Sequence, residues 1–144
     1  MRIKLTTNKE LDSAFKEKVP TDKENIKIIA FLEKSETITL FYPWPESDKT
    51  PHILLLEERI NLENFKRLYN FIKELKDEDL LILSCYDGLS VSRILAETII
   101  DSLPTHFDLT QWFELEKNLP EFPPANESLR FKLYQLFWIA NEKL

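Results

Sequence analysis

The sequence predicts an α/β domain in which helices flank a mainly parallel sheet. Runs of consecutive apolar residues at Ile53–Leu56 and Leu80–Leu83 are typical of strands that are buried on both faces. Between these runs, apolar residues recur at helical spacing from Leu62 to Leu75. A strand, a crossover helix and a second buried strand form a βαβ unit, so the two strands are predicted to run parallel.

The first part of the chain supplies the other predicted strands. Arg2–Thr6 favours a short strand, and Thr7 with Glu10 forms a capping box that starts a helix. Ile26–Leu32 predicts a second strand. Thr37–Tyr42 alternates between apolar and polar residues as a third strand would.

The stretch from Pro43 to Pro51 is predicted to be a loop, and the chain beyond the Leu80–Leu83 strand is predicted to be mainly helical, with a proline-broken stretch at Leu119–Pro124. Asn61 is a suitable cap for the helix that precedes this strand, and an amphipathic helix is expected at Ser90–Leu103. A final helix is expected after Asn126. No repeat or linker divides the sequence, so residues 1–144 are expected to form a single domain.

Composition and charge restrict the classes of function. The net charge is −6 and no dense run of Lys and Arg occurs, which argues against nucleic acid as a partner. No apolar run approaches the ~20 residues of a membrane span, and the N-terminus lacks a signal-peptide pattern. With a single cysteine no internal disulfide can form, so a cytoplasmic protein is expected.

The only glycine, Gly88, follows the Leu80–Leu83 strand and precedes the Ser90–Leu103 helix. A strand, a short glycine-containing turn and a helix N-terminus bring several backbone N–H groups together, and this arrangement favours anion binding. Cys85 stands at the carboxyl end of the strand, beneath such a loop. A thiolate there can attack phosphorus and hold a covalent phosphoenzyme. The alternative interpretation of Cys85 is a small buried core residue.

The segment Ser84–Ser92, Ser-Cys-Tyr-Asp-Gly-Leu-Ser-Val-Ser, resembles the His-Cys-x-x-Gly-x-Ser-Arg-Ser motif of the cysteine-dependent tyrosine and dual-specificity phosphatases. It is most similar to small phage and bacterial members of that superfamily. The similarity extends to Leu56-Glu57-Glu58, to Phe65–Ile72 and to Pro123–Asn126. The resemblance implies a phosphatase-like single domain with Cys85 as the nucleophile. It also implies a phosphate-binding loop made of the seven residues Tyr86, Asp87, Gly88, Leu89, Ser90, Val91 and Ser92.

The motif departs from the family pattern at three positions. Val91 stands where the family has its phosphate-binding arginine, and Ser84 stands where it has histidine. Asp87 adds a negative charge to the loop, which opposes both a phosphate and a thiolate. Arg93 is a poor substitute for the missing arginine, because it lies on another face of the helix, with Glu97, where a solvated charged stripe is expected.

Two further groups are candidates for catalytic roles. The resemblance implies a general acid at Glu57 or Glu58, and the alternative is that both are solvated carboxylates. It also aligns Ser92 with a hydroxyl that hydrogen-bonds the nucleophilic sulfur, although Ser92 can equally satisfy an N–H group of the helix. His52 and His106 are distant from each other in the sequence, so neither a metal site nor a cofactor is expected.

Three hypotheses of function follow. The first is a pseudophosphatase that binds a phosphorylated or other anionic ligand, or a protein partner, through Cys85–Ser92 without efficient turnover. The second is an active but divergent cysteine phosphatase that hydrolyses phosphomonoesters. The third is a non-catalytic protein-interaction domain whose loop binds no anion.

Overall fold

The computed structural model describes residues 2–21, 24–33, 35–36, 40–41, 51–57, 62–86 and 90–102. Within these ranges the chain is an α/β fold of alternating strands and helices. The elements in chain order are β1 Arg2–Thr7, α1 Asn8–Glu17, β2 Ile26–Leu32, β3 Ile53–Glu57, α2 Leu62–Lys73, β4 Leu80–Cys85 and α3 Ser90–Ser102.

The four strands form one sheet in the order β1-β4-β2-β3, and all three pairings are parallel. The sheet therefore has β1 and β3 at its edges and β4 beside β2 in its centre. Thr7 at the end of β1 lies opposite Cys85 at the end of β4, and Leu32 at the end of β2 lies opposite Glu57 at the end of β3. The carboxyl ends of all four strands consequently meet at one edge.

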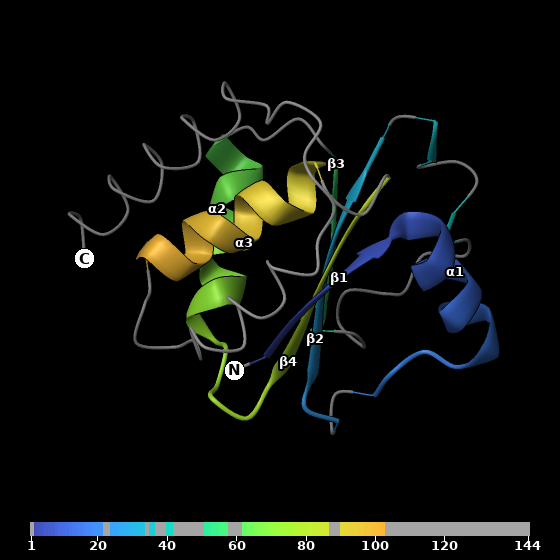
Figure 1. Cartoon of the computed structure of the whole chain (residues 1–144), viewed down its shortest axis with the longest axis horizontal. Helices are drawn as coiled ribbons and strands as arrows, with labels where there is room; N and C mark the ends of the chain where they lie inside the picture. Colours follow the sequence, from blue (N-terminus) through green and yellow to red (C-terminus); the bar gives the residue numbers. More distant parts are fainter. Residues whose placement is uncertain are drawn as a thin grey trace.

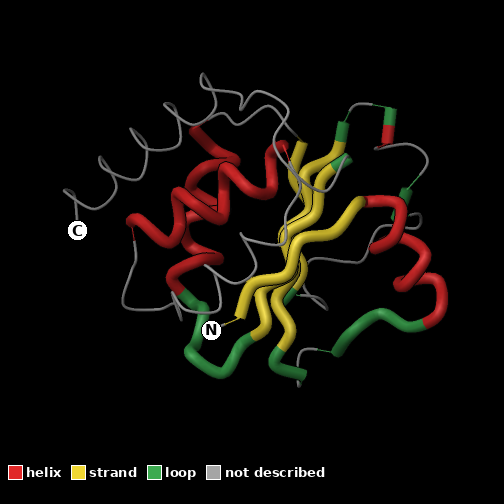
Figure 2. Tube along the Cα trace, in the orientation of Figure 1, coloured by secondary structure: helices red, strands yellow, loops and turns green. Residues whose placement is uncertain are grey.

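The helices cover the two faces of the sheet unequally. Figures 1 and 2 show α1 on one side of the strands and α2 with α3 on the other side. The larger hydrophobic cluster lies between the sheet and the α2–α3 layer, and it includes Leu83 and Cys85 from β4 and Leu68 from α2. The smaller cluster lies on the α1 side and includes Leu11 and Ile28. β2, β3 and β4 thus direct alternate side chains into the two clusters, as the two-residue period of a strand requires, whereas the edge strand β1 contributes Ile3 and Leu5 to the larger cluster.

Local sequence explains where the first two helices begin and how they are oriented. Thr7 caps α1, because its Oγ1 accepts a hydrogen bond from the backbone N–H of Glu10 at 3.1 Å. The α2 helix starts directly after Asn61 and directs Phe65 and Leu68 into the larger cluster. The predicted strands at 2–6, 26–32, 53–56 and 80–83 and the predicted helices at 62–75 and 90–103 are confirmed, with small differences at their ends.

The prediction of a strand at Thr37–Tyr42 is wrong in the part that the structure describes. Leu40 and Phe41 form a bend, and Phe41 has a positive φ of 58°, which is incompatible with an extended strand. Its backbone N–H donates a hydrogen bond to Oδ1 of Asp12 in α1 at 2.8 Å rather than to a neighbouring strand. The predicted final helix after Asn126 lies outside the described residues.

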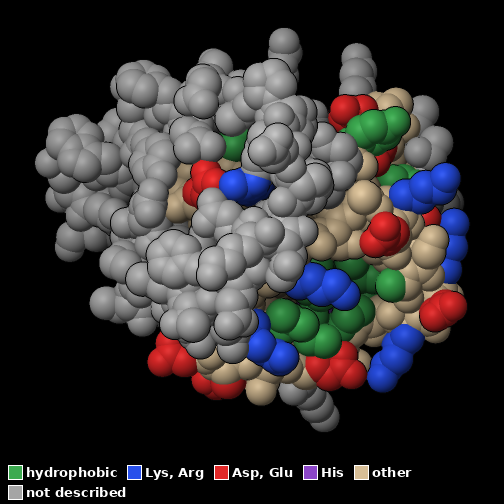
Figure 3. Space-filling view, viewed as in Figure 1, with side chains coloured by type: hydrophobic (Ala, Val, Ile, Leu, Met, Phe, Trp, Pro, Cys, Tyr) green, Lys and Arg blue, Asp and Glu red, His purple; other side chains and the backbone are tan. Residues whose placement is uncertain are grey.

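The surface of the described part carries both signs of charge. Figure 3 shows Lys and Arg side chains interspersed with Asp and Glu on one face of the molecule. Among the helices that the structure describes, none has the length and apolar character needed to cross a membrane.

Candidate functional site

The carboxyl edge of the sheet is the candidate site, because the chain leaves neighbouring strands toward opposite faces there. After β1 the chain enters α1 on one face, whereas the helix that follows β4 is α3 on the other face. Open parallel sheets bind ligands in the crevice where adjacent connections diverge in this way. The ends of β1 and β4 adjoin through the Thr7–Cys85 pairing, so the divergence occurs at Cys85.

Cys85 ends β4 in the centre of the sheet, as the sequence predicts. Its side chain is fully buried and belongs to the cluster on the α2–α3 side. The next residue, Tyr86, is the opposite case, because 61% of its surface is exposed. Asp87, Gly88 and Leu89 lie outside the described residues. The expected convergence of loop N–H groups over the sulfur therefore stays a prediction.

The first turn of α3 contains the three remaining residues of the predicted loop. Ser90 is the first residue of the helix. Val91 is buried in the larger cluster with Ile94 and Leu95, as its place on the apolar face predicts. Ser92 is fully buried, and its Oγ has no hydrogen-bond partner among the described residues. A buried hydroxyl without a partner is uncommon, because most buried polar groups in proteins are hydrogen-bonded.

Arg93 forms an ion pair with Glu97 on the same helix. Its Nε lies 3.0 Å from Oε1 of Glu97, one helical turn away. Only 14% and 18% of the two side chains are exposed, so the expectation of a solvated charged stripe is wrong. A pair that is mostly withdrawn from water is strongly coupled, and separating it would leave a charge poorly compensated.

Glu57 and Cys85 do not lie on adjacent strands. β2 separates β3 from β4, which puts the two strands ~10 Å apart at the usual spacing of strands in a sheet. Glu57 is exposed and continues the alternation in which Ile53 and Leu55 belong to the α1-side cluster, whereas Cys85 belongs to the other. The structure therefore does not bring the Glu57 side chain to the sulfur. Glu58 lies outside the described residues.

A buried hydrogen-bond network joins the carboxyl ends of three strands on the α1 side. Asn8, the first residue of α1, is fully buried, and its Nδ2 donates to the Phe31 carbonyl oxygen at 2.7 Å and to Glu36 Oε1 at 2.9 Å. Its Oδ1 accepts from Ser84 Oγ at 2.5 Å. Glu36 Oε1 also accepts from the backbone N–H of Glu33 at 3.0 Å. Ser84, which precedes Cys85 in β4, therefore serves as a donor to α1.

A cavity of about 630 Å³ opens beside this network, between α1 and the carboxyl ends of β1, β2 and β4. Its described lining consists of Thr7, Lys9, Ser35, Glu36, Leu40 and Tyr86. Of these, only Tyr86 is a predicted site residue. The sequence signal that could have identified Thr7 and Lys9 is their place just after the first parallel strand, at the same edge as Cys85.

The histidine that the structure describes is a structural residue. His52 is buried, and its Nε2 lies 2.6 Å from the carbonyl oxygen of Pro20. Its Nδ1 has no partner among the described residues. Within that same part of the chain, no group of three or more His, Cys, Asp or Glu side chains is arranged to hold a metal ion.

Comparisons of the chain with protein families, with curated proteins and with solved structures gave no match. The functional argument therefore depends on the residues at the carboxyl edge of the sheet.

Proposed function

We propose that the chain binds a phosphorylated or other anionic ligand at the carboxyl end of β4, without efficient phosphatase turnover. The observation that carries this proposal is the content of the first turn of α3. It has a buried valine where the resembled phosphatases have arginine, next to a fully buried serine hydroxyl without a described partner.

The position of Cys85 supports anion binding. It ends a central parallel strand, and α3 begins at Ser90, so a short connection joins the strand end to the N-terminus of a 13-residue helix. The unsatisfied N–H groups of that first turn and the helix dipole favour an anion at this end. The buried Oγ of Ser92 adds a hydroxyl that can donate to the same ligand or to the sulfur.

Inefficient turnover is expected because the first turn of α3 offers a phosphoryl group little positive charge. Val91 supplies no charge, and Arg93 is engaged with Glu97 in a mostly buried ion pair. Removing one preorganised donor to a developing negative charge typically lowers a rate by ~10²–10³-fold, and removing a bidentate guanidinium should lower it further. Glu57 belongs to the α1 side of the sheet, whereas Cys85 faces the other side. This candidate acid is therefore poorly placed to protonate the leaving oxygen of a phosphate ester bound at Cys85.

Binding of inorganic phosphate and phenyl phosphate, measured by calorimetry and by amide chemical shifts, tests the proposal. We expect saturable binding with shifts centred on residues 86–92, and a loss of affinity of about 10-fold in Ser92→Ala. Ser13→Ala is the matched control, because Ser13 is an exposed helical serine on α1. Absence of binding by either compound would contradict the proposal and leave the interaction-domain hypothesis.

Hydrolysis of an aryl phosphate separates the two phosphatase hypotheses. Steady turnover by the native protein that disappears in Cys85→Ser would favour the active phosphatase and refute the inactive one. Val91→Arg introduces the arginine of the resembled motif. Val91→Lys shows how much of any change is due to positive charge alone, and Val91→Ala shows how much is due to lost packing. Turnover that appears only in Val91→Arg would support a binding loop that lacks its clamp.

A further inference from the structure

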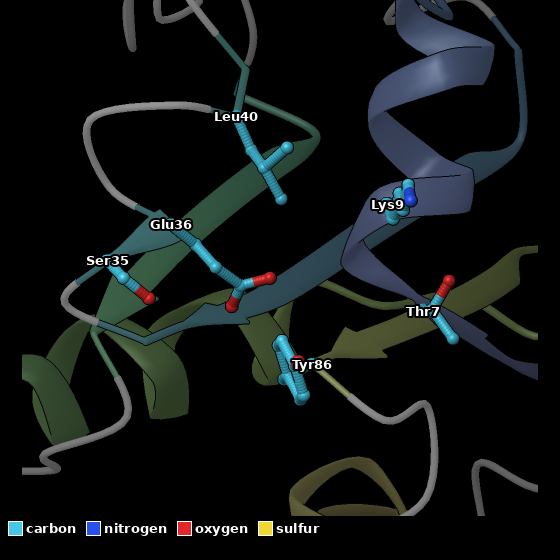
Figure 4. Close-up of a pocket in the computed structure, with 6 residues that line it drawn as sticks. All are labelled: Thr7, Lys9, Ser35, Glu36, Leu40 and Tyr86. Atoms are coloured by element: carbon cyan, nitrogen blue, oxygen red, sulfur yellow. The ribbon is translucent and has the colours of Figure 1, made fainter.

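The cavity on the α1 side combines a buried carboxylate, an exposed aromatic ring and a lysine. Its volume of about 630 Å³ lies in the range of small-molecule pockets. Figure 4 shows the Glu36 carboxylate extending toward the middle of the cavity, with Leu40 and Tyr86 on either side of it and Thr7 and Lys9 opposite. This cavity lies on the α1 side of the sheet and shares Tyr86 with the anion site proposed on the α3 side.

Glu36 is fixed in position, and no cation among the described residues pairs with it. Only 6% of its surface is exposed, although it lines the cavity. Its Oε1 accepts from Asn8 Nδ2 and from the Glu33 N–H, while Oε2 accepts no hydrogen bond from the described residues. No ion pair to this carboxylate forms within the described part of the chain. Burying a carboxylate costs free energy unless a cation or hydrogen-bond donors compensate its charge. An ammonium group bound at Oε2 would supply that compensation.

Tyr86 adds a second group that attracts cations. It is the most exposed of the large apolar side chains in the described residues, at 61%. It lines the same cavity as the Glu36 carboxylate (Figure 4). An aromatic face together with a carboxylate binds an ammonium through cation–π and ionic attraction.

Lys9 completes the charge pattern. It lines the wall opposite Glu36, and no ion pair joins the two side chains. A negative and a positive group that face one cavity from opposite sides, together with the apolar Leu40 in its lining, are complementary to a ligand that carries both charges on an apolar body.

We infer that this cavity binds a small zwitterion of the amino-acid type, with its ammonium between Glu36 and Tyr86 and its carboxylate on Lys9. The apolar part of the ligand lies against Leu40. The inference does not rest on the proposed phosphate site, because its fixed group, Glu36, lies on the α1 side of the sheet and carries a negative charge. Tyr86 is the one described residue that belongs to both sites.

Three compounds with one phenylethyl body test each charge separately by calorimetry. L-Phenylalanine carries both charges, phenethylamine only the ammonium, and 3-phenylpropanoate only the carboxylate. We expect phenylalanine to bind about 10-fold or more tightly than either of the others, since each charged contact contributes that much. Equal affinity for the three, or no binding of any at millimolar concentration, overturns the inference.

Variants assign the two charges to residues. Glu36→Gln keeps the Oε1 acceptor for Asn8 and Glu33, so the fold is retained, and it should reduce phenylalanine affinity to that of 3-phenylpropanoate. Lys9→Met should reduce it to that of phenethylamine. The matched controls are Glu78→Gln and Lys4→Met, at exposed positions away from the cavity. A loss of affinity in a control as large as in its partner variant also overturns the inference.

Tyr86→Leu keeps an apolar side chain but removes the π face. It should weaken phenethylamine several-fold and leave 3-phenylpropanoate unchanged. If Tyr86→Leu weakens both compounds equally, the ring acts through apolar contact alone and the ammonium position proposed here is wrong.

Discussion

Asn8→Ala is expected to be one of the most destabilising polar substitutions in the described part of the chain. The Asn8 side chain makes two hydrogen bonds to neutral groups, Phe31 O and Ser84 Oγ, and one to the Glu36 carboxylate. At ~1 kcal/mol for each neutral bond and ~2 kcal/mol for the charged one, the three contribute about 4 kcal/mol. Alanine recovers about 0.5 kcal/mol through its higher helix propensity. The free energy of unfolding should therefore fall by about 3–4 kcal/mol, a large part of the ~5–15 kcal/mol typical of a domain.

Urea denaturation followed by circular dichroism measures this loss, with an unchanged m-value as evidence that the unfolded state is the same. Ser84→Ala removes one of the three bonds and should lower the free energy of unfolding by about 1–2 kcal/mol. The double variant should lose about 1 kcal/mol less than the sum of the two, because the Asn8–Ser84 bond is counted twice. Asn70→Ala, at an exposed site on α2, is the matched control and should be near neutral. A loss below ~1 kcal/mol in Asn8→Ala, or strict additivity, would refute the network as a source of stability.

Three further predictions concern the helices and the sulfur. Leu68 is fully buried between α2 and the sheet, so Leu68→Ala should lower the free energy of unfolding by about 2–5 kcal/mol in urea denaturation. Lys66→Ala, at an exposed position of the same helix, should change the free energy of unfolding by no more than ~0.5 kcal/mol. Equal losses in the two variants would mean that Leu68 does not face the sheet. Thr7→Ala removes the cap of α1 and should lose about 1 kcal/mol, while Thr7→Ser should retain most of the stability; a neutral Thr7→Ala would mean that the cap is dispensable. Because Cys85 has no exposed surface, its reaction with a chromogenic disulfide should be slow in buffer and fast in denaturing urea, and stoichiometric labelling of the folded protein within the mixing time would contradict its burial.

The regular elements were predictable from the sequence because their signals are local. Buried parallel strands such as Leu80–Leu83 appear as uninterrupted apolar runs, and Thr7 with Glu10 marks a helix start within four residues. The same local information predicted that Val91 lies in the core and that Cys85 stands at a strand end. Neither prediction required knowledge of the order of the strands.

The network and the cavity were not predictable, because their contacts join distant residues. Ser84 and Asn8 are 76 positions apart, and they meet only because β4 pairs with β1. The bend at Phe41 has the same origin, since its N–H bonds to Asp12, 29 positions earlier, and this tertiary contact replaces the strand that alternation favours. Charge spacing along the helix favoured a solvated Arg93. This expectation failed because charge spacing along one helix carries no information about what packs against that helix.

The order β1-β4-β2-β3 has a consequence for how the chain acquires its structure during synthesis. β1 pairs only with β4 among the described strands, so β1 has no strand partner until β4, which ends at residue 85, has left the ribosome. Until then β2 and β3 can associate, but β1 remains an unpaired strand with open backbone donors and acceptors. Insertion of β4 between β1 and β2 closes the sheet, and the same event creates the Asn8–Ser84 bond.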